Sequence, residues 1–364
     1  MIISDICKSF DIGGQYLNCT ELTTGNINST YHARYIRDGE RKDYIVQNIN
    51  TKVFKNPEKV MENIVNVTEY VRQNIKKQNL STKKFVLRVF NTKETGKPYF
   101  VDNFGNYWRV YRYIKDSITY DTTNDMSIIE KAGQAFGRFQ NCLDGFDANS
   151  LFVPLPDFHN TKKRYSALRQ AISQDLAGRV NGVSYELTKL FELEEKATRL
   201  QTMLDSGLIP LRVTHNDTKC NNVAFDKNTG EALAVLDLDT VMPGAIAYDF
   251  GDAIRFIANK TLEDSPELDK VGIDLEKFRA FAKGFLGEVG EKLTQTEKQT
   301  LILGVLTMTV ELAVRFMTDY LNGDVYFKVK RDGHNLDRTK NQIALALDIL
   351  EKYALMEEIT AKYL

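Results

Sequence analysis

The sequence has few of the residues that build disulfide frameworks and zinc sites. Its 364 residues include only four cysteines and four histidines. The cysteines show no Cys-x-x-Cys spacing and no histidines at zinc-ligand intervals; they are Cys7, Cys19, Cys142 and Cys220. Neither a disulfide framework nor a zinc site is indicated, and we expect reduced thiols.

An excess of charge of either sign is also missing. The formal net charge is -1, from 48 Lys and Arg against 49 Asp and Glu. Proteins that bind nucleic acid or anionic membranes usually show a basic excess or a basic face, so we expect neither partner. No apolar run approaches the roughly 20 residues of a membrane span. The first residues, MIISDICKSFDIGG, lack the basic start and long apolar core of a signal peptide. We expect a cytoplasmic monomer.

What is present is the composition of a globular protein, with 43% hydrophobic and 27% charged residues over a length that suits two domains. Short β-prone segments separated by glycine turns dominate the first 113 residues. A single stretch, 57–77, has apolar residues at helical spacing there. The strands are expected at 17–22, 29–36, 43–49, 85–90, 98–101 and 107–113.

From residue 127 onward, apolar residues recur at helical spacing. The expected helices are 127–143, 157–176, 184–204, 275–285, 296–319 and 337–350. A β-rich part followed by a helix-rich part predicts an α+β protein of two lobes with the active site in the cleft between them. We place the boundary after Ile114, which gives an N-terminal nucleotide-binding lobe of residues 1–114 and a catalytic lobe of residues 115–364.

The stretch 214–255 contains the strongest chemical signal. Its first block, HNDTKCNN, has the spacing His-x-Asp-x-x-x-x-Asn, which puts Asp217 and Asn222 on one loop. Phosphoryl transfer needs such a pair, because an acid must orient the acceptor hydroxyl while an oxygen ligand nearby holds Mg²⁺. The segments 223–225 and 232–236 predict a hairpin around the turn 226–230. Closing it brings Asn222 and Asp237 together as metal ligands, and Asp239 is either a further ligand or a structural acceptor.

The letters Asp-Phe-Gly of the kinase metal motif occur later, at residues 249–251. They follow Met242-Pro243-Gly244, a turn signal that takes them away from the hairpin. We therefore interpret Asp249 as a brace for the catalytic loop, and Asp237 as the metal ligand.

These motifs resemble the aminoglycoside-phosphotransferase-like kinases, a protein-kinase-like family, and within it the N-acetylhexosamine 1-kinase branch. The resemblance lies in HNDTKCNN, in LDLDTVMPG at 236–244 and in YDFGDA at 248–253. It implies an ATP- and Mg²⁺-dependent kinase that phosphorylates the anomeric hydroxyl of N-acetylglucosamine or N-acetylgalactosamine, with Asp217 as the base. It also implies that Arg315, Tyr326 and His32 contact the sugar.

Other residues are candidates for binding the nucleotide. Backbone N–H groups of the turn containing Gly25, Asn26, Ser29 and Thr30 could cover phosphates, although one glycine between strands is usually only a turn. The third strand has Gln47 where a kinase-like fold carries a basic residue. The negative charge of the phosphates would then be offset by the metal ion, by backbone N–H groups and by another basic side chain.

Lys219 is one candidate for that side chain, and its alternative is an exposed loop lysine. The hinge at Arg112 to Ile114 would offer backbone groups to adenine.

Two other functions remain open. The chain could be a kinase of another small alcohol, such as choline, homoserine, methylthioribose or an aminoglycoside; the Arg315 and Tyr326 pair speaks against a cationic acceptor. Without the resemblance, Arg315 is equally well a helix-surface ion pair and Tyr326 a core aromatic. Gln47 would also suit a nucleotide-binding pseudokinase, but a protein without catalysis has no chemical need for Asp217.

Overall fold

A computed structural model describes residues 3–22 and 27–364. The chain forms two compact units. The first, here called the sheet unit, consists of Met1–Thr119, Gly145–Leu155 and Val223–Met242. The second, the helical unit, consists of Tyr120–Asp144, Pro156–Asn222 and Pro243–Leu364. A β-rich and a helix-rich part agree with the predicted α+β class, and both units draw on segments that are distant in the sequence.

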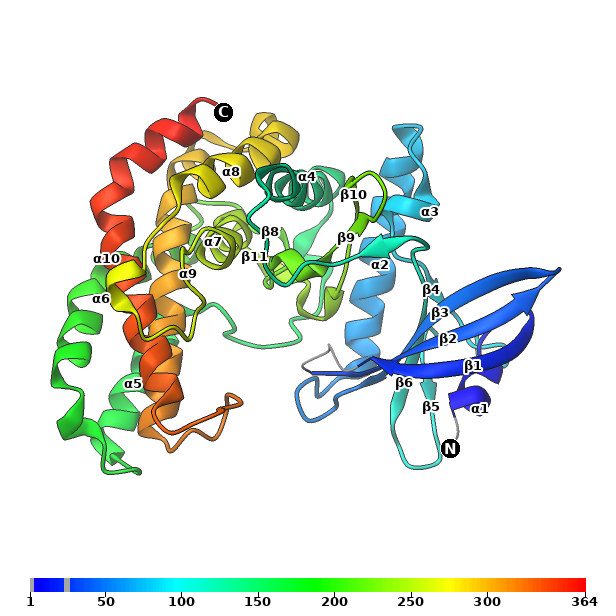
Figure 1. Cartoon of the computed structure of the whole chain (residues 1–364), viewed down its shortest axis with the longest axis horizontal. Helices are drawn as coiled ribbons and strands as arrows, with labels where there is room; N and C mark the ends of the chain where they lie inside the picture. Colours follow the sequence, from blue (N-terminus) through cyan, green and yellow to red (C-terminus); the bar gives the residue numbers. More distant parts are fainter. Residues whose placement is uncertain (1–2, 23–26) are drawn as a thin grey trace. The chain divides into compact units, whose positions relative to one another are not determined.

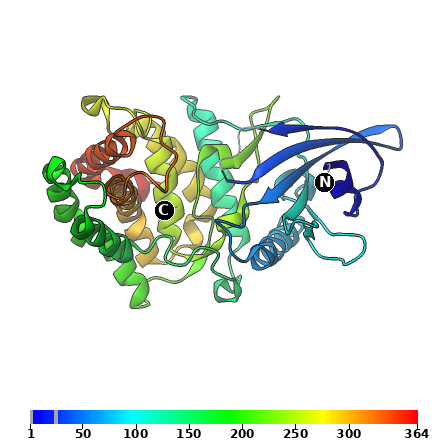
Figure 2. The same cartoon turned by 90° about the horizontal axis from the view of Figure 1, so that it is seen from below.

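The sheet unit is built on an antiparallel six-stranded sheet of order β1-β2-β3-β6-β4, with β5 paired to β6. The first three strands are the predicted meander and lie side by side in Figures 1 and 2. Asp38 and Gly39 both have positive φ and make the tight turn between β2 and β3. The strands are β1 (Gln15–Leu22), β2 (Ser29–Arg37), β3 (Glu40–Ile49), β4 (Val89–Phe90), β5 (Phe100–Val101) and β6 (Tyr107–Arg112).

The predicted helix of this unit is α2 (Pro57–Lys77). Pro57 stands at its first turn, where a missing N–H costs nothing, and the apolar positions that predicted it are buried: Val60, Ile64, Val67 and Val71. Two short helices were not predicted, α1 (Ile3–Lys8) and α3 (Thr82–Phe85). The expected strand 85–90 is reduced to β4, because α3 ends at Phe85 and residues 86–88 form neither helix nor strand.

The hairpin after the HNDTKCNN block is also confirmed. It consists of β9 (Val223–Asp226) and β10 (Ala232–Val235), and β9 pairs in addition with β7 (Ser117–Ile118). Asp226 stabilises the turn, because its carboxylate accepts hydrogen bonds from the backbone N–H of Asn228 and of Thr229. Gly230 closes it with a positive φ of 68°.

The helical unit contains all six predicted helices. Asn160 caps α5, so this helix starts later than residue 157; α10 is longer than expected at both ends. The bounds are α4 (Met126–Cys142), α5 (Thr161–Gln174), α6 (Ser184–Asp205), α8 (Leu275–Val289), α9 (Gln295–Leu321) and α10 (His334–Ala361).

One helix of this unit was missed, α7 (Ile246–Ile257). All but one of its residues are buried, including Asp249, Asp252 and Arg255, which recur every three residues and mark one polar face of the helix. This spacing predicts a helix, but the segment was interpreted only through its Asp-Phe-Gly letters. The predicted turn at 242–244 is instead the short strand β11 (Met242–Gly244), which pairs with β8 (Arg212–Thr214).

Glycines let α7 lie directly on α9. A Cβ atom added to Gly251 would stand 2.5 Å from the carbonyl carbon of Gly304 and 2.9 Å from the nitrogen of Val305. These neighbours are backbone atoms, which cannot rotate away as a side chain can. The close contact therefore requires glycine at position 251.

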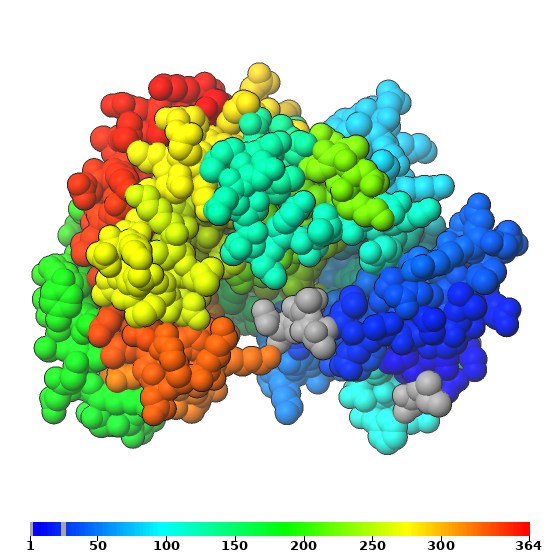
Figure 3. Space-filling view, in the orientation of Figure 1, coloured from blue at the N-terminus to red at the C-terminus, as the bar shows by residue number. Residues whose placement is uncertain are grey.

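The helix α9 corrects one expectation. By length and composition it could cross a membrane, although no apolar run was expected to approach that size. Within this structure 94% of its apolar window is buried, which is typical of a core helix. The surface turn that follows it, 322–333, is drawn in orange in Figures 1 and 3.

Candidate active site

Three predicted residues meet on the loop that follows β8. The Nζ of Lys219 lies 2.6 Å from Oδ1 of Asp217. The amide nitrogen of Asn222 donates to Oδ2 of Asp217 at 2.9 Å and to its backbone oxygen at 2.8 Å. The carboxylate is thus held from two sides. The Asp217 side chain is nevertheless 29% exposed and that of Lys219 is 35% exposed, so a substrate can reach both.

Charge also keeps this lysine protonated. Burial alone would lower the pKa of Lys219, but the negative charges of Asp217 and Asp252 outweigh burial and raise it. A cation beside a proton-accepting carboxylate fits a site that handles a negatively charged group.

The loop backbone takes an uncommon conformation at Asn216, whose φ is 65°. Asparagine tolerates this region better than most residues. His215 contributes to the loop as expected for a residue that supports the backbone: its Nδ1 accepts from the N–H of Asp217 at 3.3 Å, and its ring packs edge-on against Phe136 and Phe139.

The missed helix α7 holds this loop in place. The buried carboxylate of Asp249 accepts from the backbone N–H of His215 and of Asn216, both at 2.8 Å, and from the side chain of Gln140 at 2.7 Å. Asp252 accepts from the N–H of Thr218 at 3.2 Å and is paired with Arg255 at 2.9 Å. Asp249 therefore braces the loop that follows β8, as predicted, and the Asp-Phe-Gly letters lie inside α7.

The donors predicted for Mg²⁺ are oxygen atoms, which is the ligand type that the ion prefers. The amide nitrogen of Asn222 is engaged by Asp217, which orients its oxygen as the remaining donor. Asp237 directly follows β10 and takes the left-handed conformation, with φ 54°; such strain recurs at functional sites. The residues fit the ion, although the described ranges contain no ready-made cluster of three His, Cys, Asp or Glu side chains.

Asp239 is engaged differently. Its carboxylate accepts two hydrogen bonds from the guanidinium of Arg109 and one from the side chain of Asn28, the last at 2.6 Å. Both side chains of the pair are almost completely buried, with 1% of Arg109 and 3% of Asp239 exposed. These contacts favour the structural alternative for Asp239 over direct metal binding.

Sequence analysis missed Arg109. It stands on β6 directly opposite Gln47, and its Nε donates to the Gln47 side-chain oxygen at 3.0 Å. Gln47 in turn donates to the hydroxyl of Thr30 at 3.0 Å. The sequence did indicate this residue, because an arginine between Trp108 and Val110 in a buried strand is expected to have a charged or polar partner.

The other nucleotide candidates are distributed over the sheet unit. Ser29 and Thr30 begin β2, and Gly25 and Asn26 lie outside the described residues. Arg112 donates to the backbone oxygens of Thr82 and Lys83, the first two residues of α3. These contacts direct the Arg112 side chain toward α3.

The backbone at the predicted hinge is partly engaged. The carbonyl oxygen of Ile114 accepts from the hydroxyl of Ser117 at 2.6 Å. The Ile114 side chain packs in a small core with Ala224, Leu233 and Ala234.

The predicted sugar contacts fall in both units. In the sheet unit, His32 is hydrogen-bonded to Asp43 at 2.9 Å and stacks on the ring of Tyr113. In the helical unit, the guanidinium carbon of Arg315 lies 5.2 to 6.0 Å from three ring centroids, those of Phe158, Tyr326 and Phe327. The structure therefore brings Arg315 and Tyr326 together.

A buried acid lies beside this cationic centre. Glu311 is 3.8 Å from Arg315, and it is also hydrogen-bonded to Nδ1 of His159 at 2.9 Å. Nε2 of His159 contacts the backbone oxygen of Asn216 at 3.3 Å. This histidine therefore connects α9 to the loop that follows β8.

The turn that carries Tyr326 is stabilised through its backbone. The carboxylate of Asp319 accepts from the N–H groups of Val325, Tyr326 and Phe327 at 2.8 to 3.0 Å. The side chain of Asn335 also donates to it, at 2.9 Å. Tyr326 itself is 69% exposed.

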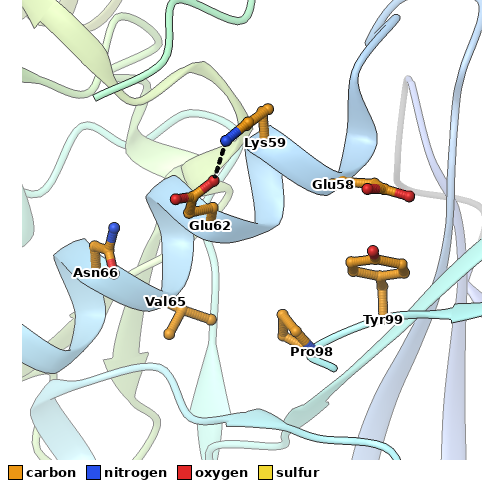
Figure 4. Close-up of a pocket in the computed structure, with 7 residues that line it drawn as sticks. All are labelled: Glu58, Lys59, Glu62, Val65, Asn66, Pro98 and Tyr99. Atoms are coloured by element: carbon orange, nitrogen blue, oxygen red, sulfur yellow. Dashed lines mark hydrogen bonds and ion pairs between the residues drawn. The ribbon is translucent and has the colours of Figure 1, made fainter. Parts of the chain in front are cut away.

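A separate surface pocket of about 340 Å³ lies beside α2. Figure 4 shows Lys59 and Glu62 paired on the helix, while Pro98 and Tyr99 lie across from Val65 and Glu58. None of the predicted site residues lines it; its remaining lining residue is Asn66.

Comparison with known proteins identifies the type of fold. A model described as the phosphotransferase enzyme family matches residues 18–280. Among solved structures, a spectinomycin phosphotransferase in complex with ADP and spectinomycin has a TM-score of 0.56 at 13% identity, covering 95% of this chain and 98% of that one.

Choline kinase from Cryptosporidium parvum Iowa II has a TM-score of 0.56 at 14% identity, covering 100% and 97% of the two chains. Ethanolamine kinase from Plasmodium vivax has 0.54 at 10% identity, covering 94% and 84%. At these identities the likeness establishes a common fold.

Proposed function

The chain belongs to the phosphotransferase enzyme family, and on that premise we propose that it is an ATP-dependent kinase that phosphorylates the anomeric hydroxyl of an N-acetylhexosamine. Asp217 is the base. It accepts the proton of the hydroxyl while the hydroxyl oxygen forms a bond to the γ-phosphorus and the bond from that phosphorus to the bridging oxygen of ADP breaks. Bound Mg²⁺ offsets negative charge on the phosphoryl oxygens.

The surroundings of Asp217 and the conformation of Asp237 support these roles. Asn222 orients Asp217 through two hydrogen bonds, so the base is preorganised. Lys219 lies beside it as a fixed positive charge. Asn222 and Asp237 supply the oxygen donors for the metal, with Asp237 held in a strained turn.

The acceptor type rests on the surroundings of Arg315. A guanidinium with three aromatic rings around it suits a neutral sugar, because it donates to hydroxyl and acetyl oxygens while a ring covers the apolar face of the sugar. The adjacent acid, Glu311, is fully buried and already paired with His159. It is therefore a poor partner for an ammonium group.

A choline-like acceptor is the second candidate, since aromatic rings also bind quaternary ammonium groups and a choline kinase shares the fold. In this chain Arg315 already lies close to these rings. A second cation would be repelled there, so we favour the sugar.

The test is ADP release measured across N-acetylglucosamine, N-acetylgalactosamine, other hexoses, choline and spectinomycin. We expect activity with the N-acetylhexosamines and a 1-phosphate product by ³¹P NMR. The methyl glycoside of N-acetylglucosamine is the matched control, since its anomeric oxygen carries no proton and it should be inert. Turnover of choline but no sugar would refute the assignment, as would an active methyl glycoside.

Asp217→Asn tests the base. We expect turnover to fall by a factor of about 10²–10⁴, the usual range for a lost general base, while nucleotide binding stays near that of the wild type. Full activity in this variant would show that another group accepts the proton.

A further inference from the structure

The sheet unit contains a buried cation that the mechanism above does not use. Gln47 occupies the third strand where a basic residue was expected, and Arg109 stands opposite it on β6. The two side chains are hydrogen-bonded at 3.0 Å. The positive charge missing from β3 is thus present on the neighbouring strand.

This arginine belongs to a hydrogen-bond network that joins three segments predicted to bind the nucleotide or its metal. Asp239, two residues after the proposed metal ligand Asp237, accepts two of its hydrogen bonds. Asn28, in the turn before β2, donates to the same carboxylate. Gln47 continues the network to the hydroxyl of Thr30.

The charge environment agrees with this placement. Burial alone would lower the pKa of Arg109, but the negative charge of Asp239, with a smaller contribution from Asp237, raises it. Arg109 therefore remains charged, and it is electrostatically coupled to the residue proposed to hold Mg²⁺.

Stability alone does not account for such a pair. A buried ion pair can often be replaced by apolar residues without loss of stability, because desolvation offsets the attraction. The pair of Arg109 and Asp239 instead combines a basic and an acidic side chain, as does the Lys–Glu ion pair that protein kinases require for phosphoryl transfer. The guanidinium has five N–H groups. Asp239 and Gln47 accept three hydrogen bonds from it, and the sulfur of Met61 accepts a fourth at 3.9 Å, which leaves one N–H as a further donor.

We propose that Arg109 is the phosphate-binding cation of the nucleotide site, with Asp239 as the carboxylate that orients it, so that the ion pair of this kinase is built on β6 and not on β3. The inference rests on the proposed use of ATP. It assigns to Arg109 a role in binding the phosphates, distinct from the acceptor chemistry at Asp217.

The test compares binding of ADP and of adenosine by calorimetry, which does not depend on turnover. For Arg109→Met we expect ADP affinity to fall about tenfold to a hundredfold, as for the loss of charge-assisted hydrogen bonds, and adenosine affinity to change less than about twofold. Equal losses for both ligands would mean that Arg109 only supports the fold. Unchanged ADP affinity would likewise overturn the proposal.

A second variant returns the charge to β3. Gln47→Lys in the Arg109→Met background puts an amine on the residue directly opposite, and we expect it to restore a large part of the ADP affinity. If this double variant folds, as judged by circular dichroism, and binds ADP no better than Arg109→Met, the proposal is wrong.

Arg109→Lys provides a test if the methionine variant does not fold. It keeps the charge and loses the forked donors, so we expect an intermediate loss for ADP alone. Wild-type protein that binds no ADP would refute the proposed function itself. Wild-type protein that binds ADP, with no effect of these variants, would refute only the role of Arg109.

Discussion

Replacing Gly251 by alanine tests whether the contact between α7 and α9 positions the catalytic loop. The added Cβ would stand 2.5 Å from the carbonyl carbon of Gly304, about 1 Å closer than carbon atoms normally approach. Since only backbone atoms lie opposite, α7 and α9 must separate.

The size of the effect follows from two opposing contributions. Alanine favours a helix over glycine by about 1 kcal/mol. Overpacking costs about 1–3 kcal/mol. Because the atoms that the Cβ would meet belong to the backbone and cannot rotate away, we expect a cost near the upper limit of this range. We expect the free energy of unfolding to fall by about 2 kcal/mol, and turnover to fall as well, because Asp249 and Asp252 on α7 hold the backbone of the loop.

Gly287→Ala is the matched control. This glycine lies on α8, and a Cβ there would have no neighbour within 4 Å, so only the helix preference of alanine should act and the protein should become slightly more stable. Urea denaturation followed by circular dichroism measures both variants, and ADP release measures turnover. A Gly251→Ala protein as stable and as active as the control would refute the reasoning.

Three further predictions concern charges. Asp237→Ala should abolish the Mg²⁺-dependent part of nucleotide binding in calorimetry; loss of metal binding in Asp249→Ala alone would mean that the wrong aspartate was chosen. Glu311→Gln should lower the free energy of unfolding by about 3 kcal/mol, because it removes a buried negative charge that contacts Arg315 and His159; urea denaturation measures this, and an effect below about 0.5 kcal/mol, typical of an exposed pair, would contradict it. Burial alone would raise the pKa of Asp102, but hydrogen bonds from Asn106 and Trp108 and from the backbone outweigh burial and lower it to about 2. Because the folded-state pKa is depressed, this stabilisation is present above pH 4 and is lost as the pH falls toward 2. Thermal unfolding between these pH values should show a smaller decline for Asp102→Asn than for the wild type.

Local patterns were sufficient to predict most of the fold. The meander, α2 and the hairpin after Asn222 each combine a clear periodicity with a turn signal, and all three are confirmed. The loop residues Asp217, Lys219 and Asn222 were found because they are close in sequence as well as in space.

Features that depend on contacts distant in sequence were missed. The helix α7 is an exception, because Asp249, Asp252 and Arg255 recur at helical spacing and the segment itself could have predicted it. Arg109 and Asp239 are 130 residues apart, and only the pairing of β3 with β6 shows that this arginine stands beside Gln47. Likewise, the bond between His159 and Glu311 joins residues 152 positions apart, and no local pattern indicates it.

The way in which Asp319 stabilises the turn at 325–327 has a consequence for how such an enzyme could change. Within the turn, its carboxylate accepts from main-chain N–H groups, which every residue except proline possesses; its side-chain partner Asn335 lies on α10. The identities of the three side chains are therefore free to vary while the loop keeps its path. Substitutions at these positions could therefore change which substrate accepts the phosphoryl group without a change in the fold of the turn.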